Sequence, residues 1–254
     1  MRSLIIQFRV IFALILREAR VRHGRSRAGY LWTIVEPVLL IGALTFLFSN
    51  FRSSSISGSS FAVFFATGVL PFQLFRSSSQ YISMAIEANG ALLNYPHVSK
   101  IDTIIARSVL DFCTHIFVIT LVISFQIFAI NAPFPADIPM MLFVIVILMA
   151  FAVGAGLCVA LLRQVFPSFA NVYLILMGPS FFLSGVFFSI NSIPKFFRDI
   201  LVWNPILHGV EGFRTAYYQG YRSPDLDMAY LFWWAFTLIF LGLLAERTMK
   251  KMIP

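Results

Sequence analysis

The chain has 254 residues, of which 59% are hydrophobic and only 12% are charged. Soluble domains carry roughly 25% charged residues, and the mean hydropathy here is +0.85. These values exclude a soluble globular domain and predict an all-α integral membrane protein. The formal net charge of +8 does not indicate a nucleic-acid partner, because basic residues cluster ahead of the first long apolar segment: Arg2, Arg9, Arg17, Arg20, Arg22, Arg25 and Arg27. Such clustering is typical of the cytoplasmic side of a membrane protein, where anionic lipid headgroups attract it.

Residues 3–23 predict an amphipathic interface helix. With about 100° of rotation per residue, Leu4, Phe8 and Ile11 fall on one side of this helix, and Arg9 and Arg20 fall nearly opposite. A helix of this kind lies in the headgroup plane instead of crossing the bilayer. The alternative is a soluble amphipathic helix that packs on a partner protein.

Six apolar segments follow, and each has about the 20 residues that a bilayer requires. We expect six transmembrane helices at 30–48, 61–81, 104–130, 140–162, 172–190 and 228–244, with both termini cytoplasmic. The chain is then a single transmembrane domain: residues 1–29 form the interface helix and a turn, 30–245 the bundle and 246–254 a cytoplasmic tail. In the fourth segment, Gly154, Gly156 and Ala160 predict a close helix contact.

The polar stretch from Ile86 to Arg107, here called the coupling segment, lies between the second and third apolar segments. It is far longer than the roughly two to eight residues that connect neighbouring helices in a bundle. We expect a short cytoplasmic helix over 85–93, a break at Pro96 and a new helix whose N-cap is Asp102. A structured loop of this kind indicates a docking element. The alternative is a long connector that only solvates itself.

The connection between the fifth and sixth segments predicts a re-entrant helical hairpin in the outer leaflet. Ser192-Ile193-Pro194 begins one short helix that runs through Trp203, and Asn204-Pro205 begins a second that runs to about Tyr218. Both helices are too short to span a bilayer and too apolar for water, and such backbone is tolerated where protein or a water-filled cavity covers it. A folded external cap is the alternative.

Motifs for catalysis are missing from the sequence. It has no Gly-x-x-x-x-Gly-Lys phosphate loop, and its four histidines are too scattered for a metal site. His208, Glu211 and Arg214 share a face of the predicted hairpin, where an interfacial ion pair is a better explanation than a metal or catalytic role. Asp111 and His115, spaced i and i+4, either relay protons or, as the better explanation, cap a helix end.

The second and fifth segments are rich in aromatic side chains. Together these rings are suited to line a passage for sugar rings by stacking, although lipid or core packing explains any single ring better. Glu36, which precedes Pro37, is expected either to face an interior cavity or to fix the helix kink through a hydrogen bond between helices. The candidate path residues of these segments are Glu36, Phe64, Phe72, Phe75, Phe181, Phe182 and Phe187.

Several motifs resemble one family, the permease subunits of bacterial capsular-polysaccharide ABC exporters, which are type-2 ABC exporters. The resemblance covers nearly the whole chain in order. Its segments are Gly29-Tyr30-Leu31-Trp32, Glu36-Pro37, Ile86-Glu87-Ala88-Asn89, Asn94-Tyr95, Ile101-Asp102-Thr103-Ile104-Ile105-Ala106-Arg107 and Trp203-Asn204-Pro205 with His208. The pattern departs locally at Pro96-His97 and Ser99-Lys100, which affects the detailed fit to an ATPase.

The resemblance implies a homodimer in the bacterial inner membrane that exports a lipid-linked capsular polysaccharide. It also implies two ABC ATPase subunits, which supply ATP and Mg²⁺ chemistry while this chain holds no cofactor, a periplasmic polysaccharide co-polymerase and an outer-membrane export channel. The lipid terminus would enter laterally, near Arg25, Arg27, Tyr30 and Trp32. The coupling residues would be Glu87, Asn89, Leu92, Leu93, Tyr95, Asp102 and Arg107.

Within the transport class, a permease for an O-antigen or teichoic-acid glycopolymer is the alternative, because the Asn-Pro of the hairpin is shared with O-antigen and other type-2 ABC exporters. Two other classes compete with a transport subunit. A membrane-embedded lipid-sugar transferase would need carboxylates or histidines clustered at one depth, and none is visible. A structural anchor would need neither the coupling segment nor the hairpin.

Overall fold

The structure is a computed structural model that describes residues 2–23, 27–49, 60–95 and 98–252. Helices dominate it, as the composition predicts. In chain order they are α1 (Arg2–His23), α2 (Arg27–Ser49), α3 (Phe61–Ser83), α4 (Ala85–Ala88), η1 (Gly90–Asn94), α5 (Lys100–Ile130), α6 (Ile138–Val165), α7 (Phe169–Leu183), η2 (Ile190–Ser192), α8 (Lys195–Leu201), α9 (Pro205–Tyr217) and α10 (Met228–Met252).

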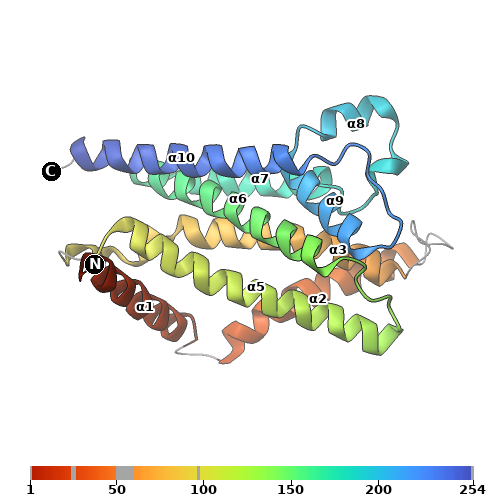
Figure 1. The fold of residues 1–254 in the computed structure, drawn as a ribbon, viewed down its shortest axis with the longest axis horizontal. Coiled ribbons are helices and arrows are strands. Elements are labelled where there is room, and N and C mark those ends of the chain that lie inside the picture. The colour runs from red at the N-terminus through yellow and green to blue at the C-terminus, as the bar shows by residue number, and fades with distance from the viewer. Residues whose placement is uncertain (1, 24–26, 50–59, 96–97, 253–254) are drawn as a thin grey trace.

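The long helices run roughly parallel to one axis of an elongated bundle (Figure 1). Both termini lie at one end, together with the start of α5, and we call this the terminal end. The short helices α8 and α9 lie toward the other end, which we call the hairpin end (Figure 1). This arrangement separates the coupling segment from the hairpin by nearly the full length of the molecule.

Close packing of α6 against α3 and α10 forms the centre of the bundle. A Cβ atom added at Gly156 would lie 2.8 Å from the carbonyl oxygen of Ser79 on α3, and one added at Gly154 would lie 2.9 Å from the backbone nitrogen of Ile239 on α10. Glycine is therefore needed at both contacts, because any side chain would push the helices apart. The predicted small-residue contact on this helix is confirmed.

Within the described residues, four helices are long and apolar enough to cross a membrane. These segments are Trp32–Ser49, Lys100–Ile130, Ile138–Val165 and Met228–Met249. Helix α3 has 23 residues but carries polar side chains over its second half, and it is almost entirely buried among its neighbours. Helix α7 has only 15 residues, or about 22 Å at 1.5 Å per residue, less than the roughly 30 Å of a hydrocarbon core.

The fifth segment ends earlier than the sequence predicts. We expect a helix over 172–190, but α7 ends at Leu183, and Gly185 has a φ of 76°. That backbone conformation favours glycine and ends the helix. The residues that follow turn their carbonyl groups inward to the side chain of Arg214, as described below. The helix of the fifth segment therefore ends at Leu183, before the expected Ile190.

Helix α1 packs along α5 with only a narrow stripe of buried residues that includes Leu14 and Glu18. The side chains of Phe8 and Phe12 are 75% and 62% exposed. The apolar side is therefore not covered by the rest of this chain, so a bilayer surface remains available to it.

Candidate functional site

The coupling segment begins with a broken helix. Helix α4 ends at Ala88, and a 3₁₀ turn, η1, follows it. The side chain of Asn89 at the break is buried: its amide donates to the carbonyl of Ala85 at 2.9 Å, and its oxygen accepts from the guanidinium of Arg17 at 2.5 Å. The continuous helix predicted over 85–93 is therefore interrupted at a residue that α1 holds in place.

Ser99 caps α5, and the prediction that Asp102 is the N-cap is wrong. The hydroxyl of Ser99 accepts from the backbone N–H of Asp102, whose carboxylate in turn accepts from the backbone N–H of Ser99 at 2.9 Å. This reciprocal arrangement is a capping box, in which the acidic residue takes the third helical position. The same carboxylate accepts from the side-chain amide of Gln7 on α1 at 3.3 Å.

A buried ion pair connects α1 to α5 one turn further along. The carboxylate of Glu18 lies 2.7 Å from the guanidinium of Arg107 and accepts from the hydroxyl of Tyr81 at 2.8 Å. Arg107 also donates to the backbone carbonyl of Tyr81 and lies 4.5 Å from the centre of its ring. Three elements, α1, α3 and α5, therefore meet at one polar cluster.

The remaining coupling residues lie on the surface of the terminal end. The carboxylate of Glu87 is half exposed and pairs with Arg163 at the end of α6 at 2.6 Å. The ring of Tyr95 is 63% exposed, and Leu92 and Leu93 are partly exposed beside it. The candidate coupling residues thus form two sets: Asn89, Asp102 and Arg107 are buried, whereas Glu87, Leu92, Leu93 and Tyr95 are at least partly exposed and form an outward surface. Pro96 lies outside the described residues.

Asp111 and His115 do not cap a helix end, because both lie well within α5 and are buried. Ser78 of α3 donates to the carboxylate of Asp111 at 2.5 Å, and Ser77 contacts the Nε2 atom of His115 at 2.9 Å. The pair thus fixes α3 against α5, and its buried polar groups are hydrogen-bonded by hydroxyl groups on the neighbouring helix.

The predicted path residues fall into two groups. Phe64, Phe72 and Phe75 are buried inside the protomer, where Phe75 stacks on Phe151 with ring centres 4.6 Å apart. Phe181 and Phe187 are partly buried and Phe182 is 62% exposed; the three rings meet at 5.1 to 5.8 Å and continue to Phe72.

On α2, Trp32 and Glu36 are exposed, and the carboxylate of Glu36 accepts from the amide of Gln73 on α3 at 2.7 Å. This is the predicted hydrogen bond between helices. Arg25 lies outside the described residues, and the side chains of Arg27 and Tyr30 are likewise outside the description.

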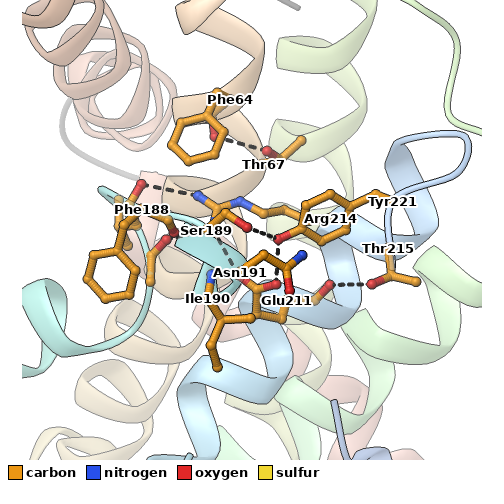
Figure 2. Close-up of polar contacts among 12 residues, drawn as sticks. Phe64, Thr67, Phe188, Ser189, Ile190, Asn191, Glu211, Arg214, Thr215 and Tyr221 are labelled. Atoms are coloured by element: carbon orange, nitrogen blue, oxygen red, sulfur yellow. Dashed lines mark hydrogen bonds and ion pairs between the residues drawn. The ribbon is translucent and has the colours of Figure 1, made fainter. Parts of the chain in front are cut away.

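A buried polar cluster stabilises the hairpin end. The guanidinium of Arg214 donates to the carbonyls of Gly185 at 2.6 Å and Phe188 at 2.7 Å, lies 3.2 Å from the carboxylate of Glu211, and sits 4.2 Å from the ring centre of Phe64 (Figure 2). The ion pair predicted between Glu211 and Arg214 is confirmed, but it is fully buried within the chain instead of interfacial. The guanidinium of Arg214 thereby provides donors for carbonyls that lie beyond the end of α7, outside any helix.

Tyr221, which follows α9, completes this cluster. Its hydroxyl donates to Glu211 at 2.7 Å and contacts the hydroxyl of Ser189 at 2.5 Å (Figure 2). Burial raises the pKa of the Tyr221 phenol, and the nearby Glu211 carboxylate raises it further. The tyrosine therefore stays protonated as a donor.

Asn204 caps α9 as predicted, since its side-chain oxygen accepts from the N–H of Ile206 at 3.0 Å, with Pro205 at the first helical position. Helix α8 is different: it begins at Lys195 without a side-chain cap, and Trp203 beyond it is 77% exposed. His208 contacts the carbonyl of Val202 and accepts from the N–H of Asp227. It therefore does not join Glu211, and no three potential metal ligands converge among the described residues.

Sequence reasoning missed the partners of these residues, which are Arg17, Glu18, Tyr81 and Arg163 for the coupling segment and Tyr221 for the hairpin. A carboxylate in the arginine-rich first helix was the one available signal, because it breaks the basic pattern around it.

Fold and site together define a multi-pass membrane protein. It has a structured outward surface at the terminal end and a buried polar cluster at the hairpin end. Residues 9–218 match the family model described as ABC-2 type transporter. This match covers most of the chain, and the chain belongs to that family.

Three relatives are similar over nearly their whole length. The chain is 35% identical to the polysialic acid transport protein KpsM of Escherichia coli over 94% of this chain and 93% of the relative. It is 33% identical to the capsule polysaccharide export inner-membrane protein CtrC of Neisseria meningitidis, over 99% and 95%, and 29% identical to the corresponding protein BexB of Haemophilus influenzae, over 98% and 94%. The family resemblance predicted from the motifs is confirmed.

The chain is accordingly the membrane subunit of a type-2 ABC exporter, a multi-pass inner-membrane protein, and not an enzyme. ATPase activity resides in a separate subunit. This excludes the lipid-sugar transferase considered above.

Proposed function

We propose that this chain moves a lipid-linked capsular polysaccharide across the bacterial inner membrane, as one of two identical membrane subunits that bind two ATPase subunits. The observation that carries the proposal is the similarity, over 94% to 99% of the chain, to a polysialic acid transport protein and to a capsule polysaccharide export inner-membrane protein. A periplasmic co-polymerase and an outer-membrane channel would complete the route.

The proposed topology has six spans with both termini cytoplasmic. Four helices meet the length and apolarity that a span requires. Helix α3 is proposed as one of the two further spans, because its polar half is buried among other helices instead of facing lipid. Helix α7 is proposed as the other span, together with the residues after it whose carbonyls bind Arg214. Helices α8 and α9 then form the re-entrant hairpin. The terminal end is cytoplasmic in this topology, in agreement with the many arginines of α1.

The outward surface formed by Glu87, Leu92, Leu93 and Tyr95 is the proposed ATPase contact. It combines a large exposed ring, two partly exposed leucines and a carboxylate at the cytoplasmic end of the bundle. Aromatic anchors of this kind dominate the energetics of many protein interfaces. Asn89, Asp102 and Arg107 act differently, since they join this surface to α1 and α5 from the inside.

An exposed carboxylate supports the proposed dimer. Glu36 is exposed on this single chain, within the apolar half of α2. Ionisable side chains within membrane-spanning segments almost always face the interior of a bundle or a water-filled cavity instead of lipid. This face of α2 therefore fits a water-filled passage between two subunits better than a lipid contact.

The test of this function is export together with ATPase co-purification in a Tyr95→Ala variant. Truncating an aromatic anchor commonly costs about 2 kcal/mol, or roughly thirtyfold in occupancy. We expect Tyr95→Ala to insert normally, to lose most of the co-purifying ATPase and to stop export of polysaccharide. Phe143→Ala is the control, because that ring is 53% exposed on α6, away from the terminal end. Normal export by Tyr95→Ala would remove the coupling role from this surface.

A further inference from the structure

Arg76, in the second half of α3, is a cation without a partner. Its backbone carbonyl accepts from the hydroxyl of Ser79, but its guanidinium makes no hydrogen bond or ion pair to a described residue. The other charged side chains that the structure describes in α2, α3, α5, α6 and α9 all have one: Glu36, Lys100, Asp102, Arg107, Asp111, Arg163, Glu211 and Arg214. We propose that Arg76 binds an anionic group, a carboxylate or a phosphate, of the exported lipid-linked glycan.

The segments outside the description hold no side-chain carboxylate that pairs with Arg76. The sequence has 11 Asp and Glu residues, and all of them lie within the described residues. Gln73, one turn from Arg76 on α3, binds the carboxylate of Glu36 at 2.7 Å, but among the described residues no ion pair joins Glu36 to Arg76. The positive charge of Arg76 is therefore left for a group from outside the chain.

Arg76 points to the side of α3 that lies between its contacts with α7 and α2. At about 100° per residue, it falls between Ser79, which accepts from the hydroxyl of Tyr173 on α7 at 2.6 Å, and Gln73, which binds Glu36 on α2. The side chain is partly exposed, although α3 is otherwise almost entirely buried among its neighbours. Bilayer lipid therefore does not surround Arg76, and the water-filled passage proposed beside Glu36 suits it.

The chemistry of Arg76 suits an oxyanion. A guanidinium carries its positive charge on a planar fork of N–H donors, which matches a carboxylate or a phosphate with two hydrogen bonds. Gln80, one turn further along α3, is also partly exposed, and its side-chain amide makes no hydrogen bond to a described residue. Its N–H groups add a neutral donor on the same face. A glycan with hydroxyl groups alone would leave the positive charge uncompensated, so the site favours an anionic one.

Arg76 lies near the entry side of the proposed topology. It stands seven residues before the end of α3 at Ser83, or about 10 Å at 1.5 Å per residue, and this end is cytoplasmic in that topology. A glycan that leaves the cytoplasm meets this cation in the first half of its path. The inference rests on the proposed function, because it names the chemical group of the exported glycan that one residue binds.

The experiment uses the full chain in phosphatidylcholine nanodiscs and octyl β-glucuronide with a diazirine on the alkyl carbon next to the sugar. After irradiation, mass spectrometry locates the label. We expect label on residues 69–84 of α3, at a yield about tenfold above that of the matched neutral octyl β-glucoside, which corresponds to roughly 1.4 kcal/mol. Arg76→Gln should abolish this preference, and Arg76→Lys should retain part of it, because an ammonium keeps the charge without the fork.

Competitors distinguish the sources of the anion. Stronger competition by unlabelled octyl β-glucuronide assigns the site to sugar carboxylates, and stronger competition by octyl phosphate assigns it to the phosphate of the lipid terminus. If phosphatidylglycerol added to the nanodiscs removes the label, a bilayer lipid occupies the site and the proposal is overturned.

Arg9→Gln is the matched control, because it removes an arginine that is exposed on α1, and it should leave the preference unchanged. The unfolding temperature of Arg76→Gln should equal that of the unmodified chain, since no internal partner is lost. A clear fall in that temperature, equal losses of preference in Arg76→Gln and Arg9→Gln, or equal labelling by the charged and neutral probes would overturn the proposal.

Export of polysaccharide is measured separately on the same chains. Full export by Arg76→Gln together with an unmodified chain that shows no preference rejects the anion site alone. A preference that depends on Arg76, in an unmodified chain that exports no polysaccharide, rejects the proposed function alone.

Discussion

Glu18 and Arg107 are separated by most of the first half of the chain, yet their charged groups lie 2.7 Å apart and are almost fully buried. The pair connects the interface helix α1 to the first third of α5, and Tyr81 of α3 contacts both residues. The coupling segment is thereby joined to α1 at several points, because Arg17 and Gln7 of the same helix bind Asn89 and Asp102.

We expect Glu18→Ala to destabilise the chain strongly, because it leaves the guanidinium of Arg107 buried without its carboxylate. Breaking one partner of a buried pair costs on the order of 3–5 kcal/mol. The double variant Glu18→Met with Arg107→Met should recover part of this loss, since it leaves no unpaired charge. Thermal unfolding in detergent measures both, and Arg9→Ala on the exposed side of α1 serves as the control. A double variant no more stable than the single one would contradict the pairing.

Gly156 tests the contact between α3 and α6. A side chain there would meet the Ser79 carbonyl and the Cβ of Ile82 at 2.8 Å, and neither atom can move without its helix. Overpacking costs about 1–3 kcal/mol, so Gly156→Leu should lower the unfolding temperature and the yield of folded chain. Gly42→Leu is the matched control, because nothing lies within 4 Å of a Cβ at that position. Equal loss in both variants would argue against the contact.

Tyr221 should make stability depend on alkaline pH. Its pKa is raised above the ordinary value of 10.0 in the folded chain. The unfolded chain therefore loses this proton first, so the contribution of Tyr221 is complete below pH 10 and declines as pH rises further. Tyr221→Phe removes a hydrogen bond to a carboxylate that contributes about 1.5–3 kcal/mol.

The measurement compares the unfolding temperature of the Tyr221→Phe variant with that of the unmodified chain, at about pH 8 and about pH 11. We expect a clear difference at the lower pH and a smaller one at the higher pH. Tyr95→Phe, whose ring is 63% exposed, should match the unmodified chain at both. If the difference in unfolding temperature between Tyr221→Phe and the unmodified chain grew with pH, the predicted effect of Tyr221 would be wrong.

Local signals in the sequence predicted several features correctly. The amphipathic pattern over 3–23 corresponds to α1, and Asn204-Pro205 begins α9. The spacing of Glu211 and Arg214 gave an ion pair. Each of these features depends on residues within one or two turns of a helix, so propensity, capping and helical periodicity suffice to predict it.

Other features depend on packing between distant segments, which a single sequence does not encode in readable form. Ser77 and His115 meet only because α3 and α5 lie side by side. The backbone beyond Leu183 is held outside a helix by Arg214, which lies on another helix and donates to the carbonyl of Gly185. Ser99 and Asp102 are both plausible N-cap residues of α5. The reciprocal hydrogen bonds between them place the cap at Ser99, so the helix begins three residues earlier than predicted.

Arg214 provides the last prediction, for the hairpin end. Its guanidinium has no exposed surface and donates to the carbonyls of Gly185, Val186 and Phe188. Arg214→Leu would remove these donors and leave Glu211 with only neutral partners, so we expect a loss on the order of 3–5 kcal/mol. The stability of Arg214→Lys should lie between those of the unmodified chain and Arg214→Leu, because an ammonium group lacks the planar fork that reaches several acceptors at once.

The accessibility of a reporter cysteine at Val186 measures how firmly Arg214 holds the backbone after α7. Val186 is fully buried, so a Val186→Cys chain without its native cysteines at 113 and 158 should resist maleimide. Adding Arg214→Leu should make the cysteine reactive, because the carbonyls around it lose the donor that holds them. Adding Glu211→Leu as well should restore part of the protection, since the buried carboxylate is then removed together with its partner. If the cysteine stays protected in the Arg214→Leu chain, packing alone holds the backbone after α7, and the guanidinium of Arg214 does not stabilise it.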